Sequence, residues 1–359
     1  MVIKVLIVDD SAVMRALLTE VLSEVPDIKV VGAAPDPIIA REMIKTLAPD
    51  VLTLDVEMPR MDGLDFLGRL MRLRPMPVVM VSSSTERGSE NTLEALALGA
   101  VDYVSKPRAD SPAQLRQYAA EVRDKVRAAY GASLKPATRS MAAPAAVSTG
   151  AHAGAVAPLS ARTLEKRLLA IGASTGGTEA LRAVLCSLPR EVPGVVMVQH
   201  MPDTFTGPFA RRLDALSQLT VVEAKGGERI LPGHAYLAPG HSHLLVKRTA
   251  GGWVTELAAT APVNRHRPSV DVLFDSVAEQ AGANATGVIL TGMGKDGARG
   301  MLAMRKAGAW NIGQDKDSCV VYGMPREAAE IGALNEVASL NDIGARIMAR
   351  LHQLDRTMT

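Results

Sequence analysis

Short apolar runs, each ending in a polar residue, recur through the first 107 residues of the chain. Such runs, separated by stretches with apolar residues at helical spacing, are typical of buried parallel strands that alternate with helices. The alternation predicts a five-stranded, doubly wound α/β domain with a parallel sheet. The predicted strands are residues 3–8, 29–32, 51–54, 77–81 and 101–107, and the last predicted helix covers residues 113–129.

Five polar residues lie at the carboxyl ends of these predicted strands, namely Asp9, Asp10, Asp55, Ser82 and Lys106. Ligands of doubly wound sheets bind at this edge, so we expect the five side chains to lie together. Crowded carboxylates raise one another's pKa unless a cation joins them, and a divalent ion such as Mg²⁺ takes oxygen ligands. Any one aspartate would be unremarkable as a helix cap or loop residue. The whole set instead favours a site where a lysine and a hydroxyl hold a phosphoryl group on Asp55.

These positions resemble the receiver domain of bacterial response regulators, which has a flavodoxin-like (βα)5 fold. The matching stretches are Asp9-Asp10, Leu54-Asp55, Met58-Pro59-x-Met61-Asp62-Gly63 and Lys106-Pro107. The resemblance implies that Asp55 is the phosphoryl acceptor and that Mg²⁺ is the cofactor of phosphorylation. It also implies how Mg²⁺ is bound: directly by Asp10 and Asp55, through water by Asp9, and by the backbone carbonyl of Glu57. Finally, it implies that the phosphorylated state is sensed by a phospho-switch, formed by Ser82, Tyr103 and Lys106.

Residues 131–164 differ in composition from the chain on either side. They are rich in Ala, Gly, Ser and Thr, are interrupted by prolines and contain no aromatic residue. This composition is typical of a flexible linker. The linker divides the chain into a domain of residues 1–130 and a second domain of residues 165–359.

The overall composition narrows the class of protein. A net charge of +2 and an aromatic content of 3% disfavour a broad nucleic-acid surface and base-stacking platforms. The apolar start of the chain is too short to span a membrane and lacks a signal-peptide cleavage pattern. Two cysteines fit a reducing compartment. We therefore expect a cytoplasmic protein that neither binds nucleic acid nor inserts into membranes. We also expect a monomer.

The second domain begins with a glycine-rich turn at Ser174, between a predicted strand at residues 168–170 and a predicted helix at residues 178–188. Backbone N–H groups at a helix start lack intrahelical partners and favour negative charge. Two uses fit this geometry: an activated serine whose oxyanion is held there, or a phosphate cradle with an incidental serine. The nucleotide interpretation is weakened because the turn has neither G-x-x-x-x-G-K-[ST] nor a clean G-x-G-x-x-G.

Two further strand ends favour the nucleophile. His200 ends a predicted strand at residues 194–200, and Asp296 lies in a glycine-rich loop after a predicted strand at residues 287–291. A parallel sheet would bring Ser174, His200 and Asp296 into one crevice. A serine needs a base to take its proton, and the base needs a third group to fix its tautomer. A lone histidine or aspartate would more often be structural, but the three together favour hydrolysis. Without a G-x-S-x-G elbow, an ordinary α/β-hydrolase is not implied.

Two other clusters have competing interpretations. His241 and His243, with His234 nearby, would suggest a metal site, but they lie in a Pro/Gly loop without a supporting ligand motif. Residues 265–267, Arg-His-Arg, form a small basic cluster that is either a solvated loop or a docking surface for acidic receptor helices.

Longer motifs resemble the CheB family of chemotaxis protein-glutamate methylesterases/protein-glutamine glutaminases. The order of receiver, linker and methylesterase domains is also that of the family. Together with the receiver motifs, the match covers nearly all of the chain except the linker. The matching stretches of the second domain are Gly172-Ala-Ser-Thr-Gly-Gly177, Gln199-His-Met-Pro202, Tyr236-Leu-Ala-Pro-Gly-His241, Asn264-Arg-His-Arg-Pro-Ser-Val-Asp271 and Thr291-Gly-Met-Gly-Lys-Asp-Gly297.

This resemblance implies a doubly wound, mainly parallel catalytic domain that needs no metal. It would hydrolyse glutamyl methyl esters of methyl-accepting chemoreceptors and deamidate specific glutamines through the same acyl-enzyme. Ser174 would attack, His200 would act as base and then acid, Asp296 would orient His200, and backbone N–H groups near Thr175 and Met293 are the candidates for the oxyanion hole. The phosphodonor would be a histidine kinase of the CheA type. The alternative class is a response regulator whose output domain only docks a partner.

Overall fold

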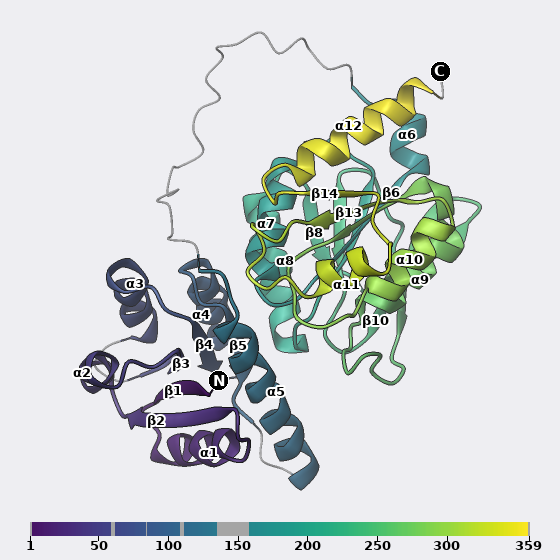
Figure 1. The fold of residues 1–359 in the computed structure, drawn as a ribbon. Helices are drawn as coiled ribbons and strands as arrows, with labels where there is room; N and C mark the ends of the chain where they lie inside the picture. Colours follow the sequence, from purple (N-terminus) through teal and green to yellow (C-terminus); the bar gives the residue numbers. More distant parts are fainter. Residues whose placement is uncertain (1, 59–61, 84, 108–110, 135–157, 358–359) are drawn as a thin grey trace, which may run out of the picture.

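The structure is a computed structural model that describes residues 2–58, 62–83, 85–107, 111–134 and 158–357. It comprises two α/β domains (Figure 1). Part of the predicted Met58–Gly63 motif and the central part of the predicted linker, residues 135–157, lie outside the described residues. No helix in the described ranges is long and apolar enough to cross a membrane.

The first domain is built on a parallel sheet with the strand order β2-β1-β3-β4-β5, as the apolar runs predict. The strands β3 and β4 are buried along their whole length, which explains why most of their residues are apolar. The strands are β1 Ile3–Val8, β2 Ile28–Ala34, β3 Val51–Asp55, β4 Val78–Ser82 and β5 Asp102–Ser105, and the helices are α1 Ala12–Ser23, α2 Pro37–Leu47, α3 Gly63–Leu73, α4 Glu86–Ala97 and α5 Pro112–Tyr130.

The second domain contains a seven-stranded parallel sheet with the order β14-β13-β12-β6-β7-β9-β8. A separate antiparallel hairpin, β10 His243–Thr249 and β11 Gly252–Ala258, packs beside it. The sheet strands are β6 Leu168–Ala173, β7 Gly194–Gln199, β8 Thr220–Glu223, β9 His234–Leu237, β12 Ala285–Ile289, β13 Trp310–Gln314 and β14 Glu336–Ala338.

Helices cover both faces of this sheet. Along β6, Leu169 and Ile171 join the core beneath one set of helices, whereas Leu168 and Ala170 join the core beneath the other, as the two-residue period of a strand requires. The first set is α7 Gly177–Ser187, α8 Asp203–Leu216 and α12 Ile343–Arg356, and the second set is α9 Val270–Gln280, α10 Ala298–Lys306 and α11 Met324–Glu330.

The end of the predicted linker differs from the sequence-based expectation. Residues 161–166 form a helix, α6 Ala161–Lys166, capped by Ser160. The hydroxyls of Ser160 and Thr163 both donate to the carboxylate of Asp355 on α12. Residues 160–164 are therefore folded onto the second domain, because a capped turn with buried hydroxyl partners outweighs the loop-like local composition.

The two domains share an apolar interface. Buried residues of α4 and β5 belong to the same hydrophobic cluster as those of α7 and α8. The ring of Tyr103 lies 4.5 Å from that of Phe205 on α8, centroid to centroid. Figure 1 shows α4 and α5 on the side of the first domain that faces the second. Thus α4 and β5 of the first domain pack against α7 and α8, the helices that follow β6 and β7.

Candidate active site

The turn after β6 presents Ser174 at the carboxyl edge of the larger sheet. The N–H of Ser174 donates to the Thr291 carbonyl at 3.0 Å, and its own carbonyl accepts from Gly177 N–H at 2.6 Å. Gly176, at the N-cap of α7, has φ 73°, a left-handed conformation that glycine adopts readily. A Cβ on Gly177 would lie 2.2 Å from Gln199 Oε1. Both glycines are therefore needed to bring the chain from strand to helix so tightly.

His200 follows β7, the neighbour of β6 in the sheet, and its ring lies between two partners. Its Nδ1 is 3.1 Å from Ser174 Oγ and its Nε2 is 2.8 Å from Asp296 Oδ2. The side-chain amide of Gln199 donates to the Ser174 and His200 carbonyls and so ties the two strand ends together. With the Nε2 proton donated to Asp296, the Nδ1 lone pair faces the serine hydroxyl. This is the arrangement in which an imidazole can take a hydroxyl proton.

Asp296 comes from the loop after β12, on the other side of β6, and is 2% exposed. Besides His200, its carboxylate accepts hydrogen bonds from the side chains of Asn264 and Ser269 and from the N–H groups of Val270 and Asp271. Val270 and Asp271 are the first residues of α9, so Asp296 caps that helix from outside. Burial raises the pKa of Asp296, but the hydrogen bond and charge of His200, with the other donors, hold it below its usual range.

The two predicted oxyanion-hole residues are chain neighbours of residues that contact each other. Thr175 follows Ser174, and the Thr175 carbonyl accepts from the hydroxyl of Thr291 at 3.0 Å. Met293 follows Gly292, which approaches Ser174 so closely that a Cβ on Gly292 would be 2.8 Å from Ser174 Cβ. The backbone N–H groups of Thr175 and Met293 thus belong to the two segments that flank Ser174.

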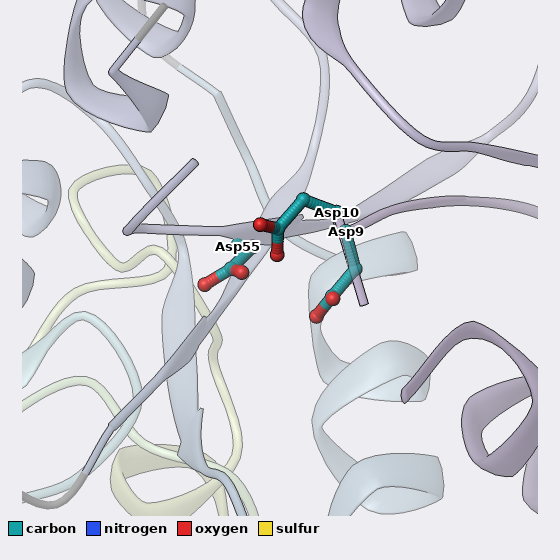
Figure 2. A group of neighbouring side chains, drawn as sticks. All are labelled: Asp9, Asp10 and Asp55. Carbon is teal, nitrogen blue, oxygen red and sulfur yellow. The ribbon is translucent and has the colours of Figure 1, made fainter. Parts of the chain in front are cut away.

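The first domain holds a cluster of carboxylates at the ends of β1 and β3 (Figure 2). Asp9, Asp10 and Asp55 each offer an oxygen, and these oxygens lie within 4.8 Å of one another. Lys106 Nζ is 2.7 Å from Asp55 Oδ2 and 3.6 Å from Asp9 Oδ2. Burial, with the charge of Asp9, raises the pKa of Asp55 to about 6 although Lys106 opposes the shift.

The carboxylate cluster fits a hard divalent cation. All its donors are oxygens, as Mg²⁺ prefers, and Asp9 Oδ2 is buried with no hydrogen-bond partner in the described ranges. Burial also raises the pKa of Asp9, so Lys106 alone does not fully stabilise the two buried carboxylates as anions. A search of the described residues for three or more neighbouring acidic, histidine or cysteine side chains that could hold a metal ion finds this cluster.

The other residues predicted for the phospho-site are more dispersed. Glu57 N–H donates to Asp55 Oδ1 at 3.2 Å. The Ser82 hydroxyl is buried and donates to the Gly88 carbonyl at 3.1 Å, towards α4. Tyr103 is buried in the domain interface against Phe205, and its hydroxyl has no hydrogen-bond partner within the described part of the chain. Ser82 therefore contacts the start of α4, and Tyr103 contacts the second domain.

The first domain reaches the residue next to Ser174. Thr175 Oγ1 donates to Asp102 Oδ2 at 2.5 Å, in a buried contact between the two domains. Lys125 on α5 donates to the other oxygen of Asp102 at 2.9 Å and to the Tyr103 carbonyl at 2.6 Å. A polar network on the receiver-like domain is thereby joined to the loop that carries the serine.

Sequence reasoning missed three residues whose side chains contact the side chain of His200 or of Asp296, namely Asn264, His266 and Ser269. Asn264 and Ser269 hold Asp296, and the ring of His266 stacks on that of His200. All three lie in the Asn264–Asp271 stretch, whose family motif was the available signal. Of the histidines considered for a metal site, His243 has both ring nitrogens in hydrogen bonds: Nδ1 accepts from Ser269 N–H, and Nε2 lies 3.1 Å from the Ala261 carbonyl.

Comparisons with known proteins identify both halves of the chain. Residues 5–119 match the response regulator receiver domain family, and residues 169–347 match the CheB methylesterase family. A protein-glutamate methylesterase/protein-glutamine glutaminase of Nitrosomonas europaea is 60% identical over 97% of this chain and 96% of its own length. The protein of that name from Methylobacillus flagellatus is 58% identical over 98% and 97%.

The similarity extends to a solved structure. The catalytic domain of a Thermotoga maritima CheB methylesterase is 40% identical, has a TM-score of 0.50, and covers 52% of this chain and 98% of that domain. The chain therefore belongs to the CheB family of protein-glutamate methylesterases/protein-glutamine glutaminases, with a response regulator receiver domain ahead of a methylesterase domain.

Proposed function

We propose that this chain is a phosphorylation-regulated hydrolase that demethylates glutamyl methyl esters of methyl-accepting chemoreceptors and deamidates specific glutamines on them. This would give adaptation in chemotaxis-type signalling. The observation that carries the proposal is the continuous set of contacts from Ser174 Oγ through the His200 ring to Asp296. The names of the close relatives supply the substrate class.

In the proposed reaction, Ser174 Oγ bonds to the γ-carbonyl carbon of the ester while His200 Nδ1 takes the hydroxyl proton. The bond from that carbon to the methoxy oxygen breaks, and His200 returns the proton so that methanol leaves. Water then attacks the γ-glutamyl ester on Ser174, with His200 again as the base. Glutamate and the free serine are restored. A glutamine passes through the same acyl-enzyme and releases ammonia.

Two sets of groups would stabilise charge during this reaction. Asp296 keeps the Nε2 proton in place and offsets the positive charge that forms on His200, which its retained negative charge allows. Backbone N–H groups of Thr175 and Met293 are our candidates for donors to the oxyanion. The close approach of Gly292 to Ser174 supports this choice, because Gly292 directly precedes Met293 in the chain and Thr175 directly follows Ser174.

For the receiver domain we assign Asp55 as the phosphoryl acceptor, with a histidine kinase of the CheA type as the donor. Mg²⁺ held by Asp9, Asp10, Asp55 and the Glu57 carbonyl would offset the negative charge of the entering phosphoryl group. Lys106 lies 2.7 Å from Asp55 and would bind that group after transfer, with the Ser82 hydroxyl as a second donor. A movement of Tyr103 would transmit the effect of phosphorylation to the interface with the second domain.

We further assign residues 1–130 to the receiver domain and residues 160–359 to the catalytic domain, so that the linker predicted over residues 131–164 ends at residue 159. Before phosphorylation, the receiver would restrict access to Ser174. The hydrogen bond between Thr175 and Asp102 supports this, since it lies one residue from the nucleophile. We expect the protein to act as a cytoplasmic monomer that needs no metal in its catalytic domain, does not bind nucleic acid and does not insert into the membrane.

Methanol release from methylated receptor membranes tests the proposed function. Ser174→Ala should lower turnover by at least ~10³-fold while leaving thermal unfolding unchanged, because the nucleophile is lost and the fold is not. Cys186→Ser, on the helix that follows the serine turn but outside the serine–histidine contact, is the matched control and should retain wild-type turnover. If Ser174→Ala keeps more than a tenth of the activity, Ser174 is not the nucleophile. If the wild-type protein binds receptors without releasing methanol, the docking-module alternative is favoured.

A further inference from the structure

The ring of His200 is covered on one face by a second imidazole. The His266 ring lies 3.7 Å from it, centroid to centroid, with 9° between the ring planes. The His200 side chain is only 7% exposed, so His266 supplies a large part of its surroundings. Ser174 and Asp296 contact the edges of the His200 ring and leave it free to rotate out of the plane that contains them. Stacking against His266 restricts this rotation.

His266 is held in this position by a tight hairpin. Val263 and His266 exchange backbone hydrogen bonds at 3.0 and 2.9 Å, and the two residues between them, Asn264 and Arg265, have φ of 52° and 68°. A left-handed conformation is unfavourable for a residue such as arginine and persists only where the surroundings enforce it. Here Asn264 enforces it by donating to both Asp271 and Asp296. The same hairpin thus fixes the triad acid and the stacked ring.

Burial, helped by nearby positive charges and opposed by Asp296, keeps His266 neutral. The titratable and charged groups that face it are His200, Asp296, Arg265 and, from the receiver domain, Lys125. Burial, followed by the charge of His200, lowers the pKa of His266 to about 3. A neutral ring can lie flat on the imidazolium that His200 becomes during the reaction, and its π face attracts that charge. A charged ring there would repel it.

We propose that His266 is a positioning residue whose flat ring holds the His200 imidazole in the plane between Ser174 Oγ and Asp296 Oδ2. The proposal rests on the proposed esterase function and deepens it. His266 would not exchange protons with the substrate. It would limit the movement of His200 between its role as a base towards Ser174 and its role as an acid towards the leaving methoxide, so its loss should act on turnover rather than on receptor binding.

The test compares His266→Ala and His266→Phe in the full-length protein, supplied with Mg²⁺ and a small-molecule phosphodonor. Methanol release gives kcat and KM with methylated receptor membranes. His266→Ala should lower kcat by about 10- to 100-fold with KM changed less than about threefold, because small misplacements of a catalytic group have effects of this size. His266→Phe keeps a flat ring and should recover at least about a third of wild-type kcat. His352→Ala, on α12 and outside the site, is the control and should match wild type.

A second readout separates positioning from a general loss of structure. In proton NMR, the downfield N–H resonance of the His200–Asp296 hydrogen bond should broaden in His266→Ala and remain in His266→Phe. Thermal unfolding shows that each variant is folded. Equal loss of kcat in folded Ala and Phe variants, an unchanged kcat in His266→Ala, or a change confined to KM would each overturn the proposal. Failure of the proposed function itself would appear differently, as no methanol release by wild type.

Discussion

At the scale of single residues, the chemistry of the site depends on how Asp296 is held. Its two carboxylate oxygens accept from His200, from two other side chains and from the N-terminus of α9. An anion buried to this degree is stable only when such donors replace water. The same donors fix its direction, and so the orientation of the His200 ring follows from the position of a helix terminus.

We predict that Asp296→Asn lowers methanol release by about 10³- to 10⁴-fold, since an amide favours the wrong tautomer of His200. The groups around Asp296 are hydrogen-bond donors, so the NH₂ group of the introduced asparagine would face other donors instead of accepting from them. Stability should therefore fall by roughly 1–3 kcal/mol, measured by denaturant unfolding. Asp317→Asn, at an exposed site, is the control for the substitution itself. Near wild-type turnover in the Asp296→Asn variant would remove Asp296 from the triad.

His266 gives a pH prediction. Its pKa is lowered from 6.5 to about 3 in the folded protein, whereas the unfolded chain takes up the proton near 6.5. The contribution of the neutral ring to stability is therefore full above pH 6.5 and is lost as the pH falls towards 3. Relative to His266→Phe, the wild-type protein should lose about 2 kcal/mol of unfolding free energy between about pH 7.5 and pH 5.

Urea unfolding of the full-length wild-type and His266→Phe proteins would measure this difference, because the receiver domain supplies Lys125, one of the charges near His266. Above about pH 7.5 the two proteins should change in parallel, because His266 is neutral in both the folded and unfolded states there. Parallel curves across the whole range, including the acidic end, would show that His266 titrates normally in the folded protein.

At the scale of elements, the site depends on how closely β6 approaches the start of α9. A Cβ on Gly172 of β6 would lie 2.2 Å from Val270 Cγ1, and Val270 is the first residue of α9. The N–H of Val270 donates to Asp296 at 2.7 Å. Any side chain on Gly172 must therefore displace the helix terminus that holds the triad acid.

We predict that Gly172→Ala destabilises the catalytic domain by about 1–3 kcal/mol, as overpacking does, and lowers methanol release at least roughly tenfold through the movement of α9. Adding Val270→Ala removes the clashing methyl groups and should restore much of the activity. Gly207→Ala, within α8, is the control, because its nearest neighbour would be 3.5 Å away. Without recovery in the double variant, the clash with Val270 is not the cause.

At the scale of the whole molecule, the receiver domain is packed against the elements that follow β6 and β7. Ser89 on α4 donates to the Thr204 carbonyl at 3.0 Å, and Arg265 Nη1 lies 3.5 Å from Asp124 on α5. The Arg265 pair is highly exposed on the arginine side and contributes little to stability. Buried contacts, above all Thr175 with Asp102 and Tyr103 with Phe205, therefore dominate this interface.

We predict that a fragment starting at Pro158 releases methanol from intact receptors faster than the unphosphorylated full-length protein. Loss of about 1.4 kcal/mol from a dominant closed state gives about tenfold more accessible enzyme. The full-length Asp55→Asn protein should stay at the low basal rate when phosphodonor and Mg²⁺ are added. A fragment no faster than unphosphorylated wild type argues against inhibition by the receiver. A full phosphodonor response in Asp55→Asn would exclude Asp55 as the acceptor.

The effect of metal removal should separate the two domains. A chelator should abolish phosphorylation of Asp55 in the full-length protein, because no divalent ion then offsets the charge of the crowded carboxylates and the entering phosphoryl group. It should leave hydrolysis by the Pro158 fragment unchanged. Phosphorylation is followed with a radiolabelled phosphodonor and hydrolysis by methanol release. A fragment that loses activity in chelator and regains it with a divalent ion would revive the metal interpretation of His241 and His243.

Much of this protein is determined locally by its sequence. Asp55, Ser174 and His200 could be placed at strand ends because each follows a short apolar run, and parallel strands bring their carboxyl ends to one edge. The glycines of the Ser174 turn could be recognised for the same reason, since the φ values they allow are a property of single residues.

Only the tertiary structure decided what surrounds those positions. Helix α4 is largely polar and was not predicted from the sequence. Its residues Leu93 and Leu96 are nevertheless buried, in the hydrophobic cluster that is shared with the second domain. The stacking of His266 on His200 and the bond from Thr175 to Asp102 join segments far apart in the chain. Periodicity specifies which face of an element is buried, but contacts between distant elements depend on how whole helices and sheets pack. A local sequence pattern therefore does not predict contacts between distant elements.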